Sequence, residues 1–301
     1  MILHVAFTPG GVLDPELKVC LVIDVLRATS TLVTMIEAGC ADIQLEPTVE
    51  AARLADSSRL RCGEEAGLRP ADFDFGNSPA EYAGRDLRGR SIVFATTNGT
   101  KALQLARRSP LVLAASLRNG PAVAAYALAE AARLGLDIQV ACSGRLGGAG
   151  IALDDSYTAG YLVDQLARLG GFSGGAGTPL GPNAGTASVD PDERQMYDSA
   201  LVAQRLYRSY IVEWPTEIDA ARAALRDSAS GRTIDAIGLA ADIEFCAQVG
   251  VTDVLPRAVS EHTPAGDRVR VTRATIETRQ HHCRPSTTGR QPVASPPQGA
   301  D

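Results

Sequence analysis

The sequence has few lysines and histidines, and its cysteines are widely spaced. Only Lys18 and Lys101 are lysines among 301 residues, so nearly all positive charge is arginine. Any phosphate site must therefore rely mainly on guanidinium groups. None of the four histidines lies in a polar cluster, which argues against phosphohistidine chemistry and a histidine metal site. The six cysteines form no CxxC pair, which argues against zinc and favours buried free thiols in a reducing compartment.

Long apolar runs and long basic runs are also missing. No stretch of about 18 apolar residues could span a membrane, and the segment MILHVAFTPGG lacks the charged and apolar regions of a signal peptide. The net charge is -6, so we expect neither a membrane nor nucleic acid as a partner. We expect a cytoplasmic protein. An acidic chain that binds an anion must create its positive potential locally, with arginines, helix N-termini or a metal ion.

Short apolar segments alternate with segments of helical spacing, and this alternation predicts the fold class. Strands are predicted over 19–25, 41–46, 59–65, 91–96, 111–116 and 137–144, and helices over 27–38, 49–55, 100–108, 121–134 and 155–169. Such alternation is typical of an α/β protein with a largely parallel sheet and helices on both faces. Ligands then bind outside the carboxyl ends of the strands.

The second half of the chain is less regular. Residues 170–190 are rich in Gly, Ser and Pro, and we interpret them as a surface loop or a lid. Helices are predicted over 192–210, 216–227 and 234–248, and residues 251–259 as a last strand or an extended segment. We expect one α/β unit over residues 1–265, built as one or two lobes. Apolar periodicity ends there, so residues 266–301 are predicted to be a disordered tail.

Polar residues follow the first predicted strand directly. Asp24 could coordinate Mg²⁺ through its carboxylate oxygens, and Arg27 could bind phosphate through its guanidinium fork. Thr29, Ser30 and Thr31 could add hydroxyl and N–H groups at the start of a helix. The same pattern also fits an ordinary helix cap with a surface ion pair.

The next polar cluster contains Glu64 and Glu65, with Asn77 in the loop beyond them. Adjacent carboxylates repel one another unless a positive charge lies beside them. A metal ion would supply that charge, and a solvated acidic loop is the alternative interpretation.

A third cluster, the run from Thr96 to Thr100, turns a strand sharply into a helix. The backbone N–H groups of Thr96, Thr97, Asn98, Gly99 and Thr100 could form an anion-binding nest, and a plain capping turn is the alternative. A fourth cluster contains Arg145 and the later pair Asp154-Asp155. Asp155 could be a metal ligand or only a helix cap.

Several known phosphate-binding motifs are excluded, because the sequence does not match their residue spacing. Cysteine phosphatases place five residues between cysteine and arginine, whereas six separate Cys20 from Arg27. A Walker A loop needs Gly-Lys-Ser/Thr, but Lys101 lies between Thr100 and an alanine. The remaining candidate groups for hydrolysing a small, acidic phosphoester are carboxylates with bound Mg²⁺ and arginines.

Together these segments resemble the 2-phosphosulfolactate phosphatase family of coenzyme M biosynthesis. The resemblance covers about residues 15–260 and rests on runs that occur in the family's order: VIDVLRATST (22–31), GEEAG (63–67), FDFGNSPAEY (73–82), ATTNGTKAL (95–103), ACSGR (141–145), DDSYTAG (154–160) and GLAADIEFCAQV (238–249). Asp154 departs from the pattern, because the acidic pair is more often Glu-Asp in the family.

The resemblance implies a three-layer α/β/α fold with a largely parallel or mixed sheet, and a magnesium-dependent phosphatase that converts 2-phosphosulfolactate to sulfolactate and phosphate. By motif position, it implies that the site residues include Asp24, Arg27, Glu64, Asn77, Thr97, Asn98, Arg145 and Asp155. With the polar clusters added, the predicted catalytic residues are Asp24, Arg27 and Arg145, the predicted metal ligands are Asp24, Glu64, Glu65 and Asp155, and the predicted phosphate-binding residues are Thr29, Ser30, Asn77, Thr96, Thr97, Asn98, Gly99 and Thr100. The alternatives are a phosphatase for another small phosphorylated acid, a non-catalytic anion-binding protein, and a nucleotide-binding transferase. The expected partner is a small anionic phosphoester, and homo-oligomerisation stays open.

Overall fold

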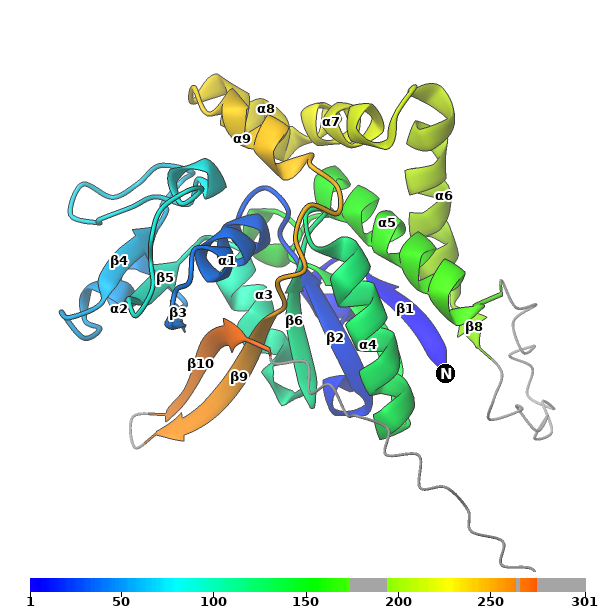
Figure 1. Cartoon of the computed structure of the whole chain (residues 1–301), viewed down its shortest axis with the longest axis horizontal. Helices are drawn as coiled ribbons and strands as arrows, with labels where there is room; N and C mark the ends of the chain where they lie inside the picture. Colours follow the sequence, from blue (N-terminus) through cyan, green and yellow to red (C-terminus); the bar gives the residue numbers. More distant parts are fainter. Residues whose placement is uncertain (174–193, 264–265, 275–301) are drawn as a thin grey trace, which may run out of the picture.

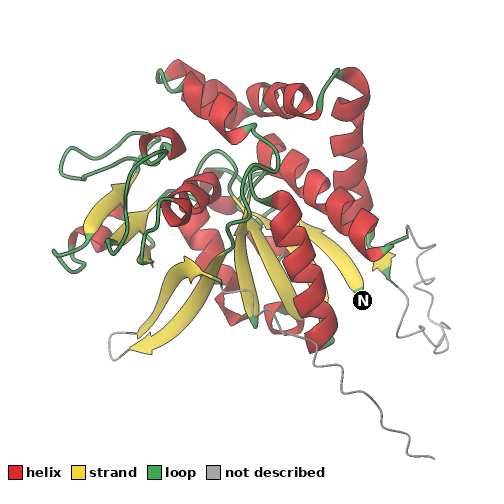
Figure 2. Ribbon diagram, in the orientation of Figure 1, coloured by secondary structure: helices red, strands yellow, loops and turns green. Residues whose placement is uncertain are grey.

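The computed structural model describes residues 1–173, 194–263 and 266–274. The segment 174–193, which holds most of the predicted loop or lid, lies outside these residues. Ten strands form one sheet in the order β4-β5-β3-β10-β9-β6-β2-β7-β1-β8 (Figures 1 and 2). The strands are β1 Ile2–Ala6, β2 Lys18–Ile23, β3 Asp42–Glu46, β4 Leu60–Gly63, β5 Ser91–Ala95, β6 Leu111–Ala115, β7 Asp137–Cys142, β8 Gln195–Met196, β9 Pro256–Thr263 and β10 Gly266–Arg273.

The sheet consists of two parallel groups joined by an antiparallel hairpin. Strands β6, β2, β7, β1 and β8 are parallel to one another, and so are β3, β4 and β5. The β9–β10 hairpin lies between the groups and pairs antiparallel with β6 on one side and β3 on the other. The two groups therefore run in opposite directions along the ladder. The α/β prediction is confirmed, and the sheet is mixed.

Helices cover both faces of the sheet, which gives three layers. They are α1 Ala28–Glu37, α2 Val49–Arg53, α3 Gly99–Leu105, α4 Gly120–Leu134, α5 Leu153–Gly170, α6 Asp198–Glu213, α7 Glu217–Asp227, α8 Ala229–Ala236 and α9 Ala240–Cys246. Alternate residues of β2 explain the layering. Leu21 and Ile23 lie in a core with residues of α4 and α5, whereas Cys20 and Val22 lie in a second core with residues of α1 and α3. No helix among the described residues is both long and apolar enough to cross a membrane.

The helix predicted over 234–248 is wrong in its bounds, because two helices, α8 and α9, occupy 229–246. Gly238 lies between them with φ +80°, a left-handed conformation that ends an α-helix and that glycine adopts without strain. Figure 1 shows α7, α8 and α9 at the top of the view, above the loops that follow the central strands. These helices thus cover the end of the sheet where the polar clusters were predicted.

The boundary of the predicted tail is also wrong. Residues 266–273 form β10, a strand inside the sheet, and β1 at residues 2–6 was not predicted. In β10 only Val269 and Val271 are buried apolar residues, with arginines between and beside them. Two alternating valines are too weak a pattern to reveal a strand by periodicity. Residues 275–301 lie outside the described part of the chain.

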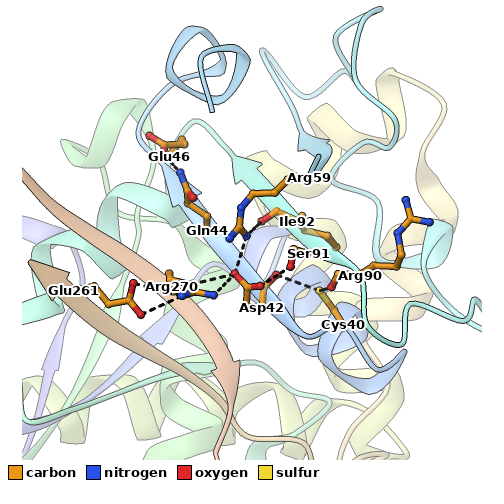
Figure 3. Close-up of polar contacts among 10 residues, drawn as sticks. All are labelled: Cys40, Asp42, Gln44, Glu46, Arg59, Arg90, Ser91, Ile92, Glu261 and Arg270. Carbon is orange, nitrogen blue, oxygen red and sulfur yellow. Dashed lines mark hydrogen bonds and ion pairs between the residues drawn. The ribbon is translucent and has the colours of Figure 1, made fainter. Parts of the chain in front are cut away.

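A network of charged residues fastens the hairpin to the second parallel group (Figure 3). The buried carboxylate of Asp42, at the start of β3, accepts hydrogen bonds from Arg59 Nη1 at 2.7 Å and Ser91 Oγ at 2.6 Å. Arg270 of β10 lies 2.7 Å from the same carboxylate. Burial alone would raise the pKa of Asp42, but the hydrogen bonds from Ser91, Arg59 and Arg270 outweigh burial and lower it. Three strands are thereby held by one matched charge cluster.

Candidate active site

The loop after β2 places Asp24 and Arg27 at the start of α1. The Thr29 hydroxyl bonds to the Asp24 backbone, as donor to its carbonyl oxygen at 2.9 Å and as acceptor from its N–H at 3.1 Å. The Ser30 hydroxyl donates to the Val25 carbonyl oxygen at 2.9 Å. The Leu26–Arg27 peptide bond in this loop is cis. Both hydroxyls, predicted as phosphate ligands, instead shape the loop that presents Asp24.

The turn after β5 packs directly against Asp24. A Cβ on Gly99 would lie 2.6 Å from Asp24 Oδ2, so only glycine allows this approach. Thr96 and Thr100 bond to each other: the Thr100 N–H donates to Thr96 Oγ1 at 3.2 Å, and the Thr100 hydroxyl donates to the Thr96 carbonyl oxygen at 3.0 Å. The predicted first and third clusters are therefore adjacent, although their strands belong to oppositely directed groups.

Glu64 joins the loop after β4 to this turn. Its Oε1 accepts from the Thr97 N–H and its Oε2 from the Gly67 N–H, both at 2.6 Å. The side chain of Glu65, by contrast, is exposed, and its backbone N–H and carbonyl oxygen bond to Leu68. The structure thus separates two neighbours that the sequence treats alike.

Asp154 and Asp155 begin α5 and are both buried. Asp155 Oδ1 accepts from the Val25 N–H at 3.0 Å, and Oδ2 accepts from Ser143 Oγ at 3.0 Å and the Gly144 N–H at 3.1 Å. Asp155 thus ties the end of β7 to the end of β2. Asp154 Oδ1 has no hydrogen-bond partner among the described residues. The carboxylate left available is therefore Asp154, which was not among the predicted ligands.

These carboxylates are held close together without a paired cation. Burial, Asp154 and Glu64 raise the pKa of Asp24 to about 7. Burial raises the pKa of Asp154 to about 6, against the opposing effects of hydrogen bonds from its own backbone and from Ser230 and of the positive charge of Arg145. Burial, Asp154 and Asp24 raise the pKa of Asp155 well above its ordinary value. Buried carboxylates that repel one another form a site that favours an incoming cation.

The two predicted arginines differ in their surroundings. Arg27 is buried, with Nη1 2.9 Å from Asp242 Oδ2 and Nη2 donating to the Gly67 carbonyl oxygen at 2.6 Å. Arg145 is half-buried, and its guanidinium acts on Asp154 through charge. Arg27 is therefore held in one place by protein groups, whereas Arg145 remains available to a ligand.

One residue that supports Arg27, Asp242, was not found by the strand-end rule. Asp242 lies on α9, and it also accepts a hydrogen bond from Ser78 Oγ at 2.5 Å. Asn77, predicted to bind phosphate, is buried beside them, and its Oδ1 has no partner within the described ranges. Only the run 238–249 in the family resemblance pointed to this helix. These hydrogen bonds connect α9, one of the helices that cover the strand ends, to the site.

The residues present fit a hard divalent cation in part. In residues 1–173, 194–263 and 266–274, no three Asp, Glu, His or Cys side chains form a ready metal cage. Mg²⁺ is usually held by one or two carboxylates together with water and substrate phosphate, so a three-residue cage is not needed. The unpartnered Oδ1 of Asp154 and the repelling pair Asp24–Asp154 provide such carboxylates.

Carboxylates and arginines gathered where strands end are groups that phosphoryl-transfer enzymes use, and the comparisons with known proteins place the chain in the phosphatase class. A model of the family described as 2-phosphosulpholactate phosphatase matches residues 8–261. The chain belongs to the 2-phosphosulfolactate phosphatase family, as the sequence resemblance predicted.

Similar curated proteins agree with the family model. A protein of Deinococcus radiodurans is 36% identical over 256 residues, which cover 82% of this chain and 91% of the relative. A protein of Thermus thermophilus is 37% identical over 240 residues, covering 79% and 86%. A third, of Carboxydothermus hydrogenoformans, is 33% identical over 259 residues, covering 85% and 92%. Each relative is named a probable 2-phosphosulfolactate phosphatase.

Proposed function

We propose that this protein hydrolyses 2-phosphosulfolactate to sulfolactate and phosphate with the help of Mg²⁺. The observation that carries the proposal is the buried pair Asp24–Asp154, whose pKa values are raised to about 7 and about 6. Repelling carboxylates without a salt-bridge partner in the described chain destabilise a fold unless they serve a ligand. The names of the relatives supply the substrate.

Asp24 and Asp154 would hold the metal ion in this proposal. When bound, Mg²⁺ supplies positive charge for a phosphate oxygen and lowers the pKa of a bound water. Asp155 and Glu64 act as positioning residues, because their carboxylate oxygens already accept hydrogen bonds from the loops. Glu65, which is exposed, has no part in the site.

The two arginines, Arg145 and Arg27, would have different roles. Arg145 would bind an oxygen of the transferring phosphoryl group, since its guanidinium is not bonded to a described carboxylate and acts on Asp154 through charge. Arg27, fixed by Asp242 and Gly67, holds a positive charge near Asp24 and opposes the rise of its pKa. Arg27 therefore offsets part of the effect by which burial, Asp154 and Glu64 raise the pKa of Asp24.

Two routes of phosphoryl transfer fit these residues. Water could attack phosphorus directly, or Asp24 could form an aspartyl-phosphate that water then hydrolyses. Acid quenching of a single turnover with phosphate-labelled substrate, followed by peptide mapping, separates them. Label on the Asp24 peptide indicates the covalent route, and unlabelled protein with full phosphate release indicates direct attack.

Phosphate release from 2-phosphosulfolactate by metal-stripped protein, with and without added Mg²⁺, tests the proposal. We expect turnover only with the metal. A panel with 2-phospholactate and other small phosphorylated acids tests the alternative substrates. Absence of turnover on 2-phosphosulfolactate with any divalent cation would overturn the proposal. The cytoplasmic location stays a prediction, supported by five buried free cysteines, and so does homo-oligomerisation.

A further inference from the structure

A cavity of about 320 Å³ lies between α3 with its preceding turn and the loop that follows β7. Its polar lining comes from Asn98, Lys101, Gln104 and Arg107 on one side and from Ser143 on the other. Gly147 and Gly148, in the loop between β7 and α5, lie along the same wall. The volume is in the range of pockets that bind small molecules. The proposed function leaves this cavity without a role.

One face of α3 and its preceding turn builds the cationic wall. Asn98, Lys101 and Gln104 are spaced three residues apart, so their side chains lie on the same side of the helix. Ala102 and Leu103, on the other side, are buried in the core. Packing of the helix therefore fixes which face Lys101 presents.

The cavity carries charge of one sign. The described residues that line it include no aspartate or glutamate, whereas Lys101 and Arg107 are both cationic. Within the described part of the chain, Lys101 forms no ion pair. Arg107 Nε lies 3.7 Å from Asp267, which is outside the lining. This is a local positive potential in a protein of net charge -6, and it uses one of the two lysines in the sequence.

The inner wall of the cavity reaches the carboxylate site at two points. Asn98 directly precedes Gly99, whose backbone packs against Asp24. Ser143 donates its hydroxyl proton to Asp155. The cavity and the carboxylate site thus share the residues Asn98 and Ser143 as their border, which is where a ligand bound in both would pass.

We propose that this cavity binds the sulfonate arm of the substrate, with Lys101 as its principal cation. The inference rests on the proposed function and adds to it the residues that select the substrate. A sulfonate has three acceptor oxygens, and the cavity offers an ammonium, a guanidinium and the side-chain amides of Asn98 and Gln104. Lys101 is a specificity residue here and not a member of the metal site.

Steady-state kinetics of Lys101→Met test the proposal with two substrates. 2-Phosphosulfolactate carries the sulfonate, whereas 2-phospholactate keeps the phosphate and the carboxylate but lacks it. We expect KM for 2-phosphosulfolactate to rise about 10- to 100-fold, the usual effect of a lost charge-assisted hydrogen bond. KM for 2-phospholactate should change less than about twofold, and kcat should change little. If 2-phospholactate turns over slowly, its inhibition constant gives the same comparison.

Arg108→Gln is the matched control. It removes one positive charge from the segment next to Arg107 but lies outside the cavity, where Arg108 pairs with Glu16 at 3.1 Å. This variant should keep both KM values, and Lys101→Arg should restore part of the affinity. Equal effects of Lys101→Met on both substrates, or no effect on either, overturn the inference. If the unmodified protein does not hydrolyse 2-phosphosulfolactate at all, the proposed function itself is wrong, and this result is distinct from the outcomes above.

Discussion

Two groups of buried carboxylates in this protein have opposite electrostatics. Asp42 is matched by Arg59, Arg270 and Ser91, and its pKa is lowered. Asp24 and Asp154 face each other without an ion pair in the described residues, and their pKa values are raised to about 7 and about 6. The first group stabilises the fold, whereas the second costs stability.

The difference shows how a buried acid can be assigned a role. A charge that is fully paired inside the protein has no capacity left for a ligand. A charge whose burial is opposed only by a few hydrogen bonds retains that capacity, and such groups gather at functional sites. All three are buried aspartates, so residue type alone does not distinguish them, although Asp42 begins β3, Asp24 follows the end of β2 and Asp154 lies in the first turn of α5.

Among the substitutions considered, Asp24→Asn should have the largest effect on activity. We expect turnover to fall by about 1,000-fold or more, since a central charge of the site is lost. The free energy of unfolding at pH 8 should stay the same or rise, because a repelling buried charge is removed and Asn can still accept from the Ala28 N–H. Kinetics and urea unfolding measure both. If the variant loses both stability and activity, Asp24 stabilises the fold, and the loss of activity follows from unfolding.

Asp42→Asn should show the reverse pattern. Two guanidinium groups lose their shared carboxylate, so the free energy of unfolding should fall by about 2 to 3 kcal/mol, while kcat at a permissive temperature stays within about twofold. Asp86→Asn is the control, because Asp86 pairs with Arg88 in an exposed position and should cost less than about 0.5 kcal/mol. Equal losses in the two variants would contradict the assigned role of Asp42.

The two groups should also respond to pH with opposite sign. The folded protein keeps protons on Asp24 and Asp154 that the unfolded chain releases above the ordinary pKa of 3.8, so metal-free stability should fall as pH rises from about 4 to about 7. Asp42 contributes stability above its ordinary pKa of 3.8, which is lost as pH falls below that value.

Urea unfolding in EDTA across pH 3 to 8 (roughly the span between these titrations) measures both slopes. Asp24→Asn should flatten the fall toward neutral pH, and Asp42→Asn should flatten the loss in acid. An unchanged neutral slope in Asp24→Asn would show that Asp24 is ionised throughout.

Glu65→Gln should have the smallest effect. The Glu65 side chain is exposed, and the bonds of this residue to Leu68 are made by its backbone, so turnover should stay within about twofold and stability within about 0.5 kcal/mol. The same assay and unfolding experiment as for Asp24→Asn measure it. A large loss of magnesium-dependent turnover would show that Glu65 takes part in the site.

Strand-end patterns predicted the α/β class and placed Asp24, Glu64 and the Thr96–Thr100 turn at the carboxyl ends of strands, where ligands bind. A single edge of one parallel sheet does not explain why these residues meet, because the second group of strands runs oppositely. The pattern also could not separate Glu64 from Glu65 or Asp154 from Asp155. Adjacent residues share a sequence signal, whereas their hydrogen bonds depend on which loop packs beside each side chain.

The β9–β10 hairpin also bears on how the enzyme is made. It occupies residues 256–273, the last described strands, yet it lies in the middle of the sheet. A growing chain on the ribosome therefore carries both parallel groups, with open edges at β3 and β6, before it carries the strands that join them. The two parallel groups can therefore be joined through the sheet only after residues 256–273 have been made.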